Sequence, residues 1–183
     1  MSTPGKAQIE LRLRELAQLF NSMDPSPFID RDLDADAEEF IVSWARELPV
    51  GHEIDLVIHL AMVPPPDRAA GAGDAVRHYF ASRAEIRQRD FRRLMRQGRF
   101  SLGVGLLFLG VCVSLNEVVA KLGYGGTTAE IARESLLIGG WVAIWRPLEI
   151  YLYDWWPLRA ERRLLQKLAR MSVRLVLPPT GNP

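Results

Sequence analysis

Cysteine is almost absent from this chain, and its one cysteine among 183 residues, Cys112, lies inside an apolar run. A single cysteine has no partner for a disulfide and no companion ligand for a metal. We therefore expect Cys112 to be a small buried hydrophobic residue.

The first six residues contain no apolar segment, so we expect no cleavable signal peptide and assign membrane insertion to internal segments.

Histidine and recognisable catalytic motifs are also scarce. His52, His59 and His78 lie far apart, without the spacing of paired zinc ligands, and the sequence has no nucleophile elbow. A metal or hydrolytic site then needs residues from distant parts of the chain to converge in space. We expect no cofactor.

Two short motifs lack the residues that their chemistry requires. Acidic residues at positions 30, 32, 34 and 36 suggest a calcium loop, but Ala35 and Ile41 stand where glycine and glutamate are needed. We interpret this run as helix capping, with Asp36 and Glu39 suited to a capping box. The GAG sequence at 71–73 lacks the third glycine and the lysine of phosphate-binding loops, and we expect a surface loop there.

The charge balance gives no sign of a nucleic-acid partner. Lys and Arg number 23 and Asp and Glu 22, a formal net charge of +1. The basic residues are nevertheless clustered, with eight arginines between residues 77 and 99 and six Lys or Arg between 159 and 174. We expect no nucleic-acid partner and read the two clusters as signals of membrane orientation.

The two ends of the chain carry the pattern of a small α+β domain. Alternating apolar residues predict strands near 8–15, 54–61 and 172–177. The first of these also fits a helix through Ile9, Leu13 and Leu16, and we favour the strand. Helices are expected after Asp36 and over about 74–99, with an ordered, proline-punctuated loop at 21–28.

Two apolar segments predict a membrane hairpin with spans at about 101–121 and 131–153. Residues 100–116 are uncharged, and extension to 121 approaches the roughly 20 residues that cross a bilayer core. The second span reaches this length only by including Arg146, Pro147 and Glu149. The basic clusters place both ends of the hairpin, and both chain termini, in the cytoplasm. Small residues suited to packing within the hairpin or to an oligomer contact are Ser101, Gly105, Gly110, Ser114, Gly139, Gly140 and Ala143.

Arg146 and Glu149 are the most notable polar residues of the apolar region. Their i,i+3 spacing places them on one helix face, where they can neutralise each other. Such a pair is functional if it lies at membrane depth and structural if it lies at the interface, and both interpretations stay open. The further candidate site residues are Asp154, Glu117, Asp24, Arg31 and Asp32.

Four segments together resemble an uncharacterised family of small bacterial two-span inner-membrane proteins. They are LFNSMDPSPF at 19–28, RDLD at 31–34, GWVAIWRP at 140–147 and YDWWP at 153–157. The resemblance covers most of the chain. It implies a place in the bacterial inner membrane and carries no activity with it.

The predicted architecture is an α+β membrane protein with a small cytoplasmic α/β domain and an inserted transmembrane hairpin. The domain occupies 1–99, the hairpin 100–156, and a cytoplasmic helix, strand and tail 157–183. The expected function is a non-enzymatic accessory, scaffold or regulatory inner-membrane protein, with an oligomeric transporter or channel subunit as the alternative. A membrane-bound enzyme that uses acidic residues of the 24–36 loop is a third hypothesis. The expected partners are the lipid bilayer and either further copies of the chain or other membrane proteins.

Overall fold

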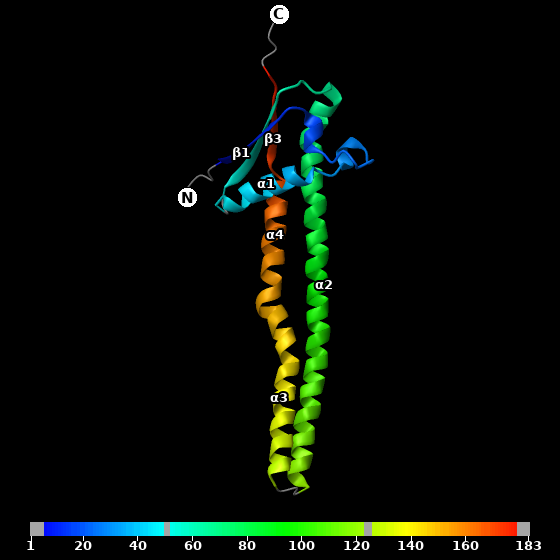
Figure 1. The fold of residues 1–183 in the computed structure, drawn as a ribbon, viewed down its shortest axis with the longest axis vertical. Helices are drawn as coiled ribbons and strands as arrows, with labels where there is room; N and C mark the ends of the chain where they lie inside the picture. Colours follow the sequence, from blue (N-terminus) through cyan, green and yellow to red (C-terminus); the bar gives the residue numbers. More distant parts are fainter. Residues whose placement is uncertain (1–5, 50–51, 123–125, 179–183) are drawn as a thin grey trace, which may run out of the picture. The chain divides into compact units, whose positions relative to one another are not determined.

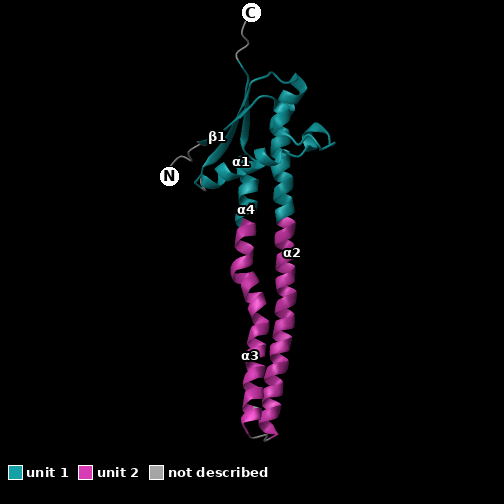
Figure 2. Cartoon of the chain, viewed as in Figure 1, with its two compact units in different colours: residues 1–87, 160–183 teal, residues 88–159 magenta. Residues whose placement is uncertain are grey.

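A computed structural model describes residues 6–49, 52–122 and 126–178 (Figure 1). The chain divides into two compact units, shown in Figure 2: a sheet unit, residues 1–87 and 160–183, and a helical unit, residues 88–159. The main elements are β1 Lys6–Leu13, α1 Ala35–Glu47, β2 Glu53–Leu60, α2 Pro66–Lys121, α3 Thr127–Glu149, the π-helix η3 Ile150–Asp154, α4 Trp155–Leu168 and β3 Ser172–Val176. The predicted tail beyond residue 178 lies outside the described residues.

The sheet unit contains a three-stranded parallel sheet in the order β1-β2-β3. The alternation at the start of the chain therefore forms a strand and not a helix. It ends at Leu13, two residues earlier than predicted, and the chain then turns through a short 3-10 helix, η1 Leu16–Leu19. The side chains of Glu15 and Gln18 cap this turn reciprocally, which explains why the strand stops there.

One face of this sheet carries the core. Ile9, Leu56 and Ile58 lie on it almost fully buried, together with the helical residues Ile41 and Phe80. The opposite face carries polar side chains such as Glu10, Arg12 and Asp55, together with the apolar Val57 and Val176. The three strands lie in the sheet in the same order as in the sequence. When successive parallel strands are joined by right-handed crossovers in this order, the connecting helices lie on the same face of the sheet. This order accounts for a sheet that is covered on one side.

Helix α1 begins at a different cap from the one predicted. The Asp34 side chain accepts a hydrogen bond from the Asp36 backbone nitrogen at 3.1 Å, so Asp34 is the N-cap and the predicted Asp36–Glu39 capping box is wrong. The helix ends at Glu47, before Pro49. Its apolar stripe, including Ile41 and Ala45, faces the core.

Helix α2 is longer than predicted, because it begins at Pro66 and includes the predicted loop at 71–73. Proline is well accommodated in the first helical turn, where its missing N–H has no helical partner. The two glycines cost roughly 1 kcal/mol each relative to alanine, but burial of Ala72, Ala75 and Val76 in the core outweighs this. The predicted junction near residue 98 is uninterrupted.

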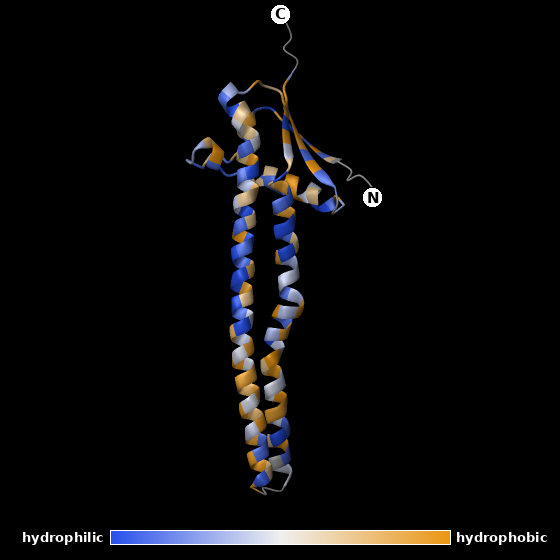
Figure 3. Cartoon of the chain, turned by 180° about the vertical axis from the view of Figure 1, so that it is seen from behind, coloured by the Kyte–Doolittle hydropathy of each residue, from blue (hydrophilic) through white to orange (hydrophobic). Residues whose placement is uncertain are grey.

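Within the described residues, α2 is the one helix long and apolar enough to cross a membrane. Its apolar stretch is only 11% buried, which is unlike the core helix of a soluble protein. Figure 3 shows the hydrophobic colour over much of α2 and α3 in the helical unit. The uncharged stretch of α3 is shorter, because Arg133 and Glu134 precede it and Arg146 and Glu149 follow it. Among the described residues, the predicted second span is therefore not shown.

Helices α2 and α3 pack against each other through small residues within the helical unit. A Cβ atom placed on Gly105 would lie 2.8 Å from the carbonyl oxygen of Ala143, and one on Gly140 would lie 2.6 Å from the Leu109 side chain. Cys112 lies in this same contact and is buried, as predicted. Buried and half-buried positions recur at intervals of three and four residues along α2, the spacing of helices that cross at a small angle.

Candidate functional site

The helical unit brings together three of the predicted site residues. The Arg146 Nη1 atom lies 3.0 Å from Glu149 Oε2 and 3.6 Å from Asp154 Oδ2, so one guanidinium faces two carboxylates. The three side chains are 59%, 42% and 34% exposed, respectively. Arg146 and Glu149 therefore form an ion pair, as their spacing predicts, and Asp154 is its second acceptor.

The π-helix explains why Asp154 lies on this face. In a straight α-helix a residue eight positions further on is rotated by roughly 80°. The wider turn of η3, Ile150–Asp154, adds backbone to each turn and keeps Asp154 beside Arg146. Such wide turns occur often at functional sites, and this one directly follows Pro147.

Pro147 also changes the bonding of the helix before it. The α-helical partner of the Ala143 carbonyl would be the N–H of residue 147, which proline lacks. One α-hydrogen of Gly105 points at this same carbonyl oxygen, since a Cβ atom in its place would lie 2.8 Å away. A weak C–H···O contact can form there, and only glycine permits so close an approach. Gly105 and Pro147 thus both affect the Ala143 carbonyl group: Pro147 removes its helical hydrogen-bond donor, and Gly105 lets α2 approach it closely.

The structure separates the small residues that the sequence left ambiguous. Gly105, Gly140 and Ala143 serve the contact between α2 and α3. A Cβ atom on Gly103, Gly110 or Gly139 would meet nothing within 4 Å. These three glycines leave open small-residue positions on the outer surfaces of both helices.

The loop in the sheet unit brings together Asp24, Arg31 and Asp32. The two Asp24 carboxylate oxygens accept hydrogen bonds from the backbone nitrogens of Ser26 at 2.9 Å and Asp32 at 2.8 Å. The Asp32 backbone bond and the Ser26 bonds hold the Asp24 pKa down at about 2. Asp24 is therefore a brace of the loop.

Glu117 lies apart from the other predicted residues. It is exposed on α2 and forms no hydrogen bond or ion pair with another described residue. The structure gives no account of a role for it.

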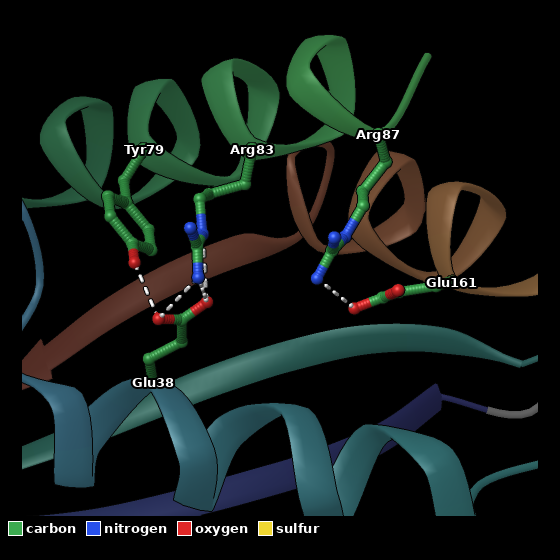
Figure 4. Close-up of polar contacts among 5 residues, drawn as sticks. All are labelled: Glu38, Tyr79, Arg83, Arg87 and Glu161. Carbon is green, nitrogen blue, oxygen red and sulfur yellow. Dashed lines mark hydrogen bonds and ion pairs between the residues drawn. The ribbon is translucent and has the colours of Figure 1, made fainter. Parts of the chain in front are cut away.

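The sheet unit holds a polar cluster that the sequence did not reveal (Figure 4). Tyr79 donates its hydroxyl hydrogen to Glu38 Oε2 at 2.6 Å, and Arg83 Nε and Nη2 donate to Glu38 Oε1 at 3.1 and 3.0 Å. Burial and the bond to Glu38 raise the pKa of Tyr79. Nearby, Arg87 Nη2 donates to Glu161 Oε1 at 3.1 Å. These bonds join α1 to α2 and α2 to α4.

Three of the five residues of this cluster follow a pattern that is visible in the sequence. Tyr79, Arg83 and Arg87 recur every four residues, so they lie on one face of α2. Their acceptors lie far along the chain, with Glu38 separated by 41 residues from Tyr79 and Glu161 by 74 from Arg87. Spacing within a helix cannot identify such partners.

Residues 6–49, 52–122 and 126–178 contain no group of three or more His, Cys, Asp or Glu side chains that could hold a metal ion. Comparison of the chain with protein families, with curated proteins and with solved structures finds no match.

Proposed function

We propose that this protein is a membrane-anchored scaffold or regulatory module without catalytic chemistry of its own. The observation that supports it is the course of α2, one uninterrupted helix of 56 residues. Its first part supplies Val76 and Phe80 to the core of the sheet unit, and its later part is exposed and apolar. A helix of this kind ties a folded domain to a bilayer.

The size of the exposed apolar surface supports a lipid environment for residues 100–122. Ten large apolar side chains of this segment are 40% exposed or more. Complete burial of such a side chain is worth about 1.5–3 kcal/mol. Covering even half of these ten surfaces is therefore comparable to the roughly 5–15 kcal/mol that stabilise a typical domain.

We further propose that α3 is a second span and that both termini are cytoplasmic. Helix α3 packs on α2 and exposes Trp141, Val142 and Trp145. Arg146 is paired with Glu149 and Asp154, which lowers the cost of placing these charges near a bilayer. The clusters of basic residues at 77–99 and 159–174 favour a cytoplasmic position for both flanks.

Membrane extraction and compartment reporters test this proposal. The full chain should stay in the membrane fraction through an alkaline carbonate wash. A reporter fused after Pro183 should read cytoplasmic, and one inserted at Gly126 should read external. Release by the wash would contradict the anchor, whereas a cytoplasmic signal at Gly126 would contradict only the second span.

A second candidate function is a subunit of an oligomeric transporter or channel. It is favoured by the open positions at Gly103, Gly110 and Gly139, where another helix could approach closely. Two spans form a pathway only by assembly, so this function requires several copies in one complex. Purification in mild detergent followed by native mass spectrometry distinguishes the channel or transporter subunit from the scaffold. A closed homo-oligomer favours the pore, and a single copy bound to other proteins favours the scaffold.

A further inference from the structure

A cavity of about 220 Å³ lies in the sheet unit where β1 and β2 end. Its walls come from the segment after β1, the segment after β2 and the first turn of α2, together with two side chains of the 21–32 loop. The carboxyl ends of parallel strands are the usual position of ligands in α/β sheets. Apolar side chains form most of the lining, including those of Leu16, Phe20, Phe28, Met62 and Val63.

Two arginines give this cavity a positive charge. Arg31 has a buried Nε atom without a hydrogen-bond partner among the described residues, and its Nη2 atom reaches only the Ser26 carbonyl oxygen at 3.5 Å. That distance is at the outer limit of a hydrogen bond. Arg68, in the first turn of α2, forms no hydrogen bond or ion pair with a described residue. Because the Arg31 Nε atom is buried, a ligand in the cavity would meet the outer nitrogens of the two guanidinium groups, which can donate charge-assisted hydrogen bonds.

The one carboxylate of the lining does not supply that acceptor. Glu15 accepts a hydrogen bond from the Gln18 backbone as part of the cap of η1. The lining therefore holds two guanidinium groups and one carboxylate, and the Arg31 guanidinium also interacts with the Asp24 carboxylate, whose pKa it lowers. The charge of the lining favours an anion.

The loop holds Arg31 in place without a ligand. The Asn21 backbone nitrogen donates to the Asp32 carbonyl oxygen at 2.8 Å, and Asp24 braces the interior of the loop. The Phe28 ring packs on the Phe20 ring, with centroids 4.9 Å apart. The wall that carries Arg31 is thus preformed, which limits the entropy lost on binding.

We propose that this cavity binds a small ligand that carries a carboxylate or phosphate group on a compact apolar body. The oxyanion accepts hydrogen bonds from Arg31 and Arg68, and the apolar part contacts the Phe20 and Phe28 rings. The volume equals that of about seven liquid waters and lies below the roughly 300–1,000 Å³ of sites for drug-sized ligands. A benzoate-sized molecule fits this limit. The inference does not rest on the proposed membrane role.

Calorimetric titration of the full chain in lipid nanodiscs tests the proposal with three probes: benzoate, phenyl phosphate and inorganic phosphate. The first two separate the carboxylate from the phosphate, and the third measures the oxyanion without an apolar body. We expect saturable 1:1 binding of benzoate or phenyl phosphate, tighter than that of inorganic phosphate. Arg31→Gln and Arg68→Gln should each weaken it by about tenfold or more, as expected for loss of one charge-assisted hydrogen-bonding partner.

Arg12→Gln is the matched control, because Arg12 is exposed on the opposite face of the sheet and does not line the cavity. It should leave binding unchanged. Arg68 is exposed, so its substitution keeps the test informative even if Arg31→Gln disturbs the loop. Absence of saturable binding for all three probes would overturn the proposal. Equal affinity in the Arg68→Gln and Arg12→Gln variants would overturn it as well. Membrane extraction of the same variants reports separately on the anchor.

Discussion

The sheet unit and the helical unit bring their polar side chains together over very different distances along the chain. In the sheet unit, Glu38 binds residues 41 and 45 positions away, and Arg174 binds Asp55 across 119 positions. In the helical unit, Arg146 and Glu149 are three positions apart. The sheet unit buries its apolar residues inside, whereas the helical unit exposes many of them and relies on close backbone approach at glycine. The second pattern includes α2, the one described helix that is long and apolar enough to cross a membrane.

The largest expected difference between the units concerns the burial of phenylalanine. Phe80 is fully buried in the core of the sheet unit, and Phe108 is about half exposed on the helical unit. Phe80→Ala should cost about 3–5 kcal/mol, because it removes apolar contacts and leaves a cavity. Phe108→Ala should change the stability of the sheet unit little. Denaturant unfolding followed by amide hydrogen exchange in β1, β2 and β3 checks this, and equal losses of stability in the two variants would contradict the difference between the units.

The next largest effect concerns the contact between α2 and α3. Gly105→Ala should cost about 1–3 kcal/mol, because the new methyl group collides with the Ala143 carbonyl oxygen. Gly103→Ala is the matched control on the same helix, where nothing lies within 4 Å. It should be neutral or gain up to about 1 kcal/mol from helix propensity. Thermal unfolding in detergent measures both, and a neutral Gly105→Ala would refute the role assigned to this contact.

A smaller effect is expected at the ion pairs of Arg146. Glu149→Gln alone should cost at most about 1 kcal/mol, because Asp154 still faces the guanidinium and the pair is substantially exposed. The double change Glu149→Gln and Asp154→Asn leaves Arg146 without a carboxylate and should cost more than the sum of the single changes. Thermal midpoints in lipid nanodiscs measure this coupling. Additive losses would show that Asp154 does not replace Glu149.

The smallest effect is a pH dependence of the 21–32 loop. The Asp24 pKa is about 2 in the folded chain, below the ordinary value of 3.8. Its contribution to stability is therefore complete above pH 3.8 and is lost as the pH falls through about 2. Amide hydrogen exchange at Ser26 and Asp32 should stay slow at pH 4 relative to the Asp24→Asn variant. Carboxyl titration by NMR with a midpoint near 3.8 would contradict the bracing role.

The sequence by itself determined the features that depend on local pattern. Alternation of Ile9 and Leu11 with polar residues favours a strand over the helix that the same segment also fits, since side chains on a strand alternate between faces. The apolar run after Phe100 and the i,i+3 spacing of Arg146 and Glu149 are equally local. For the same reason, the burial of Cys112 followed from its apolar surroundings.

Tertiary structure alone decided the features that depend on residues distant in sequence. Glu38 pairs with Tyr79 and Arg83, and not with a partner within its own helix, because packing brings α1 against α2. Residues 71–73 are helical because burial of Ala72 and Ala75 outweighs the glycine penalty, an effect that no local propensity contains. Gly105 differs from Gly103 only in what lies opposite it, the Ala143 carbonyl on another helix. The cavity at Arg31 likewise exists only because loops after two separate strands meet at one edge of the sheet.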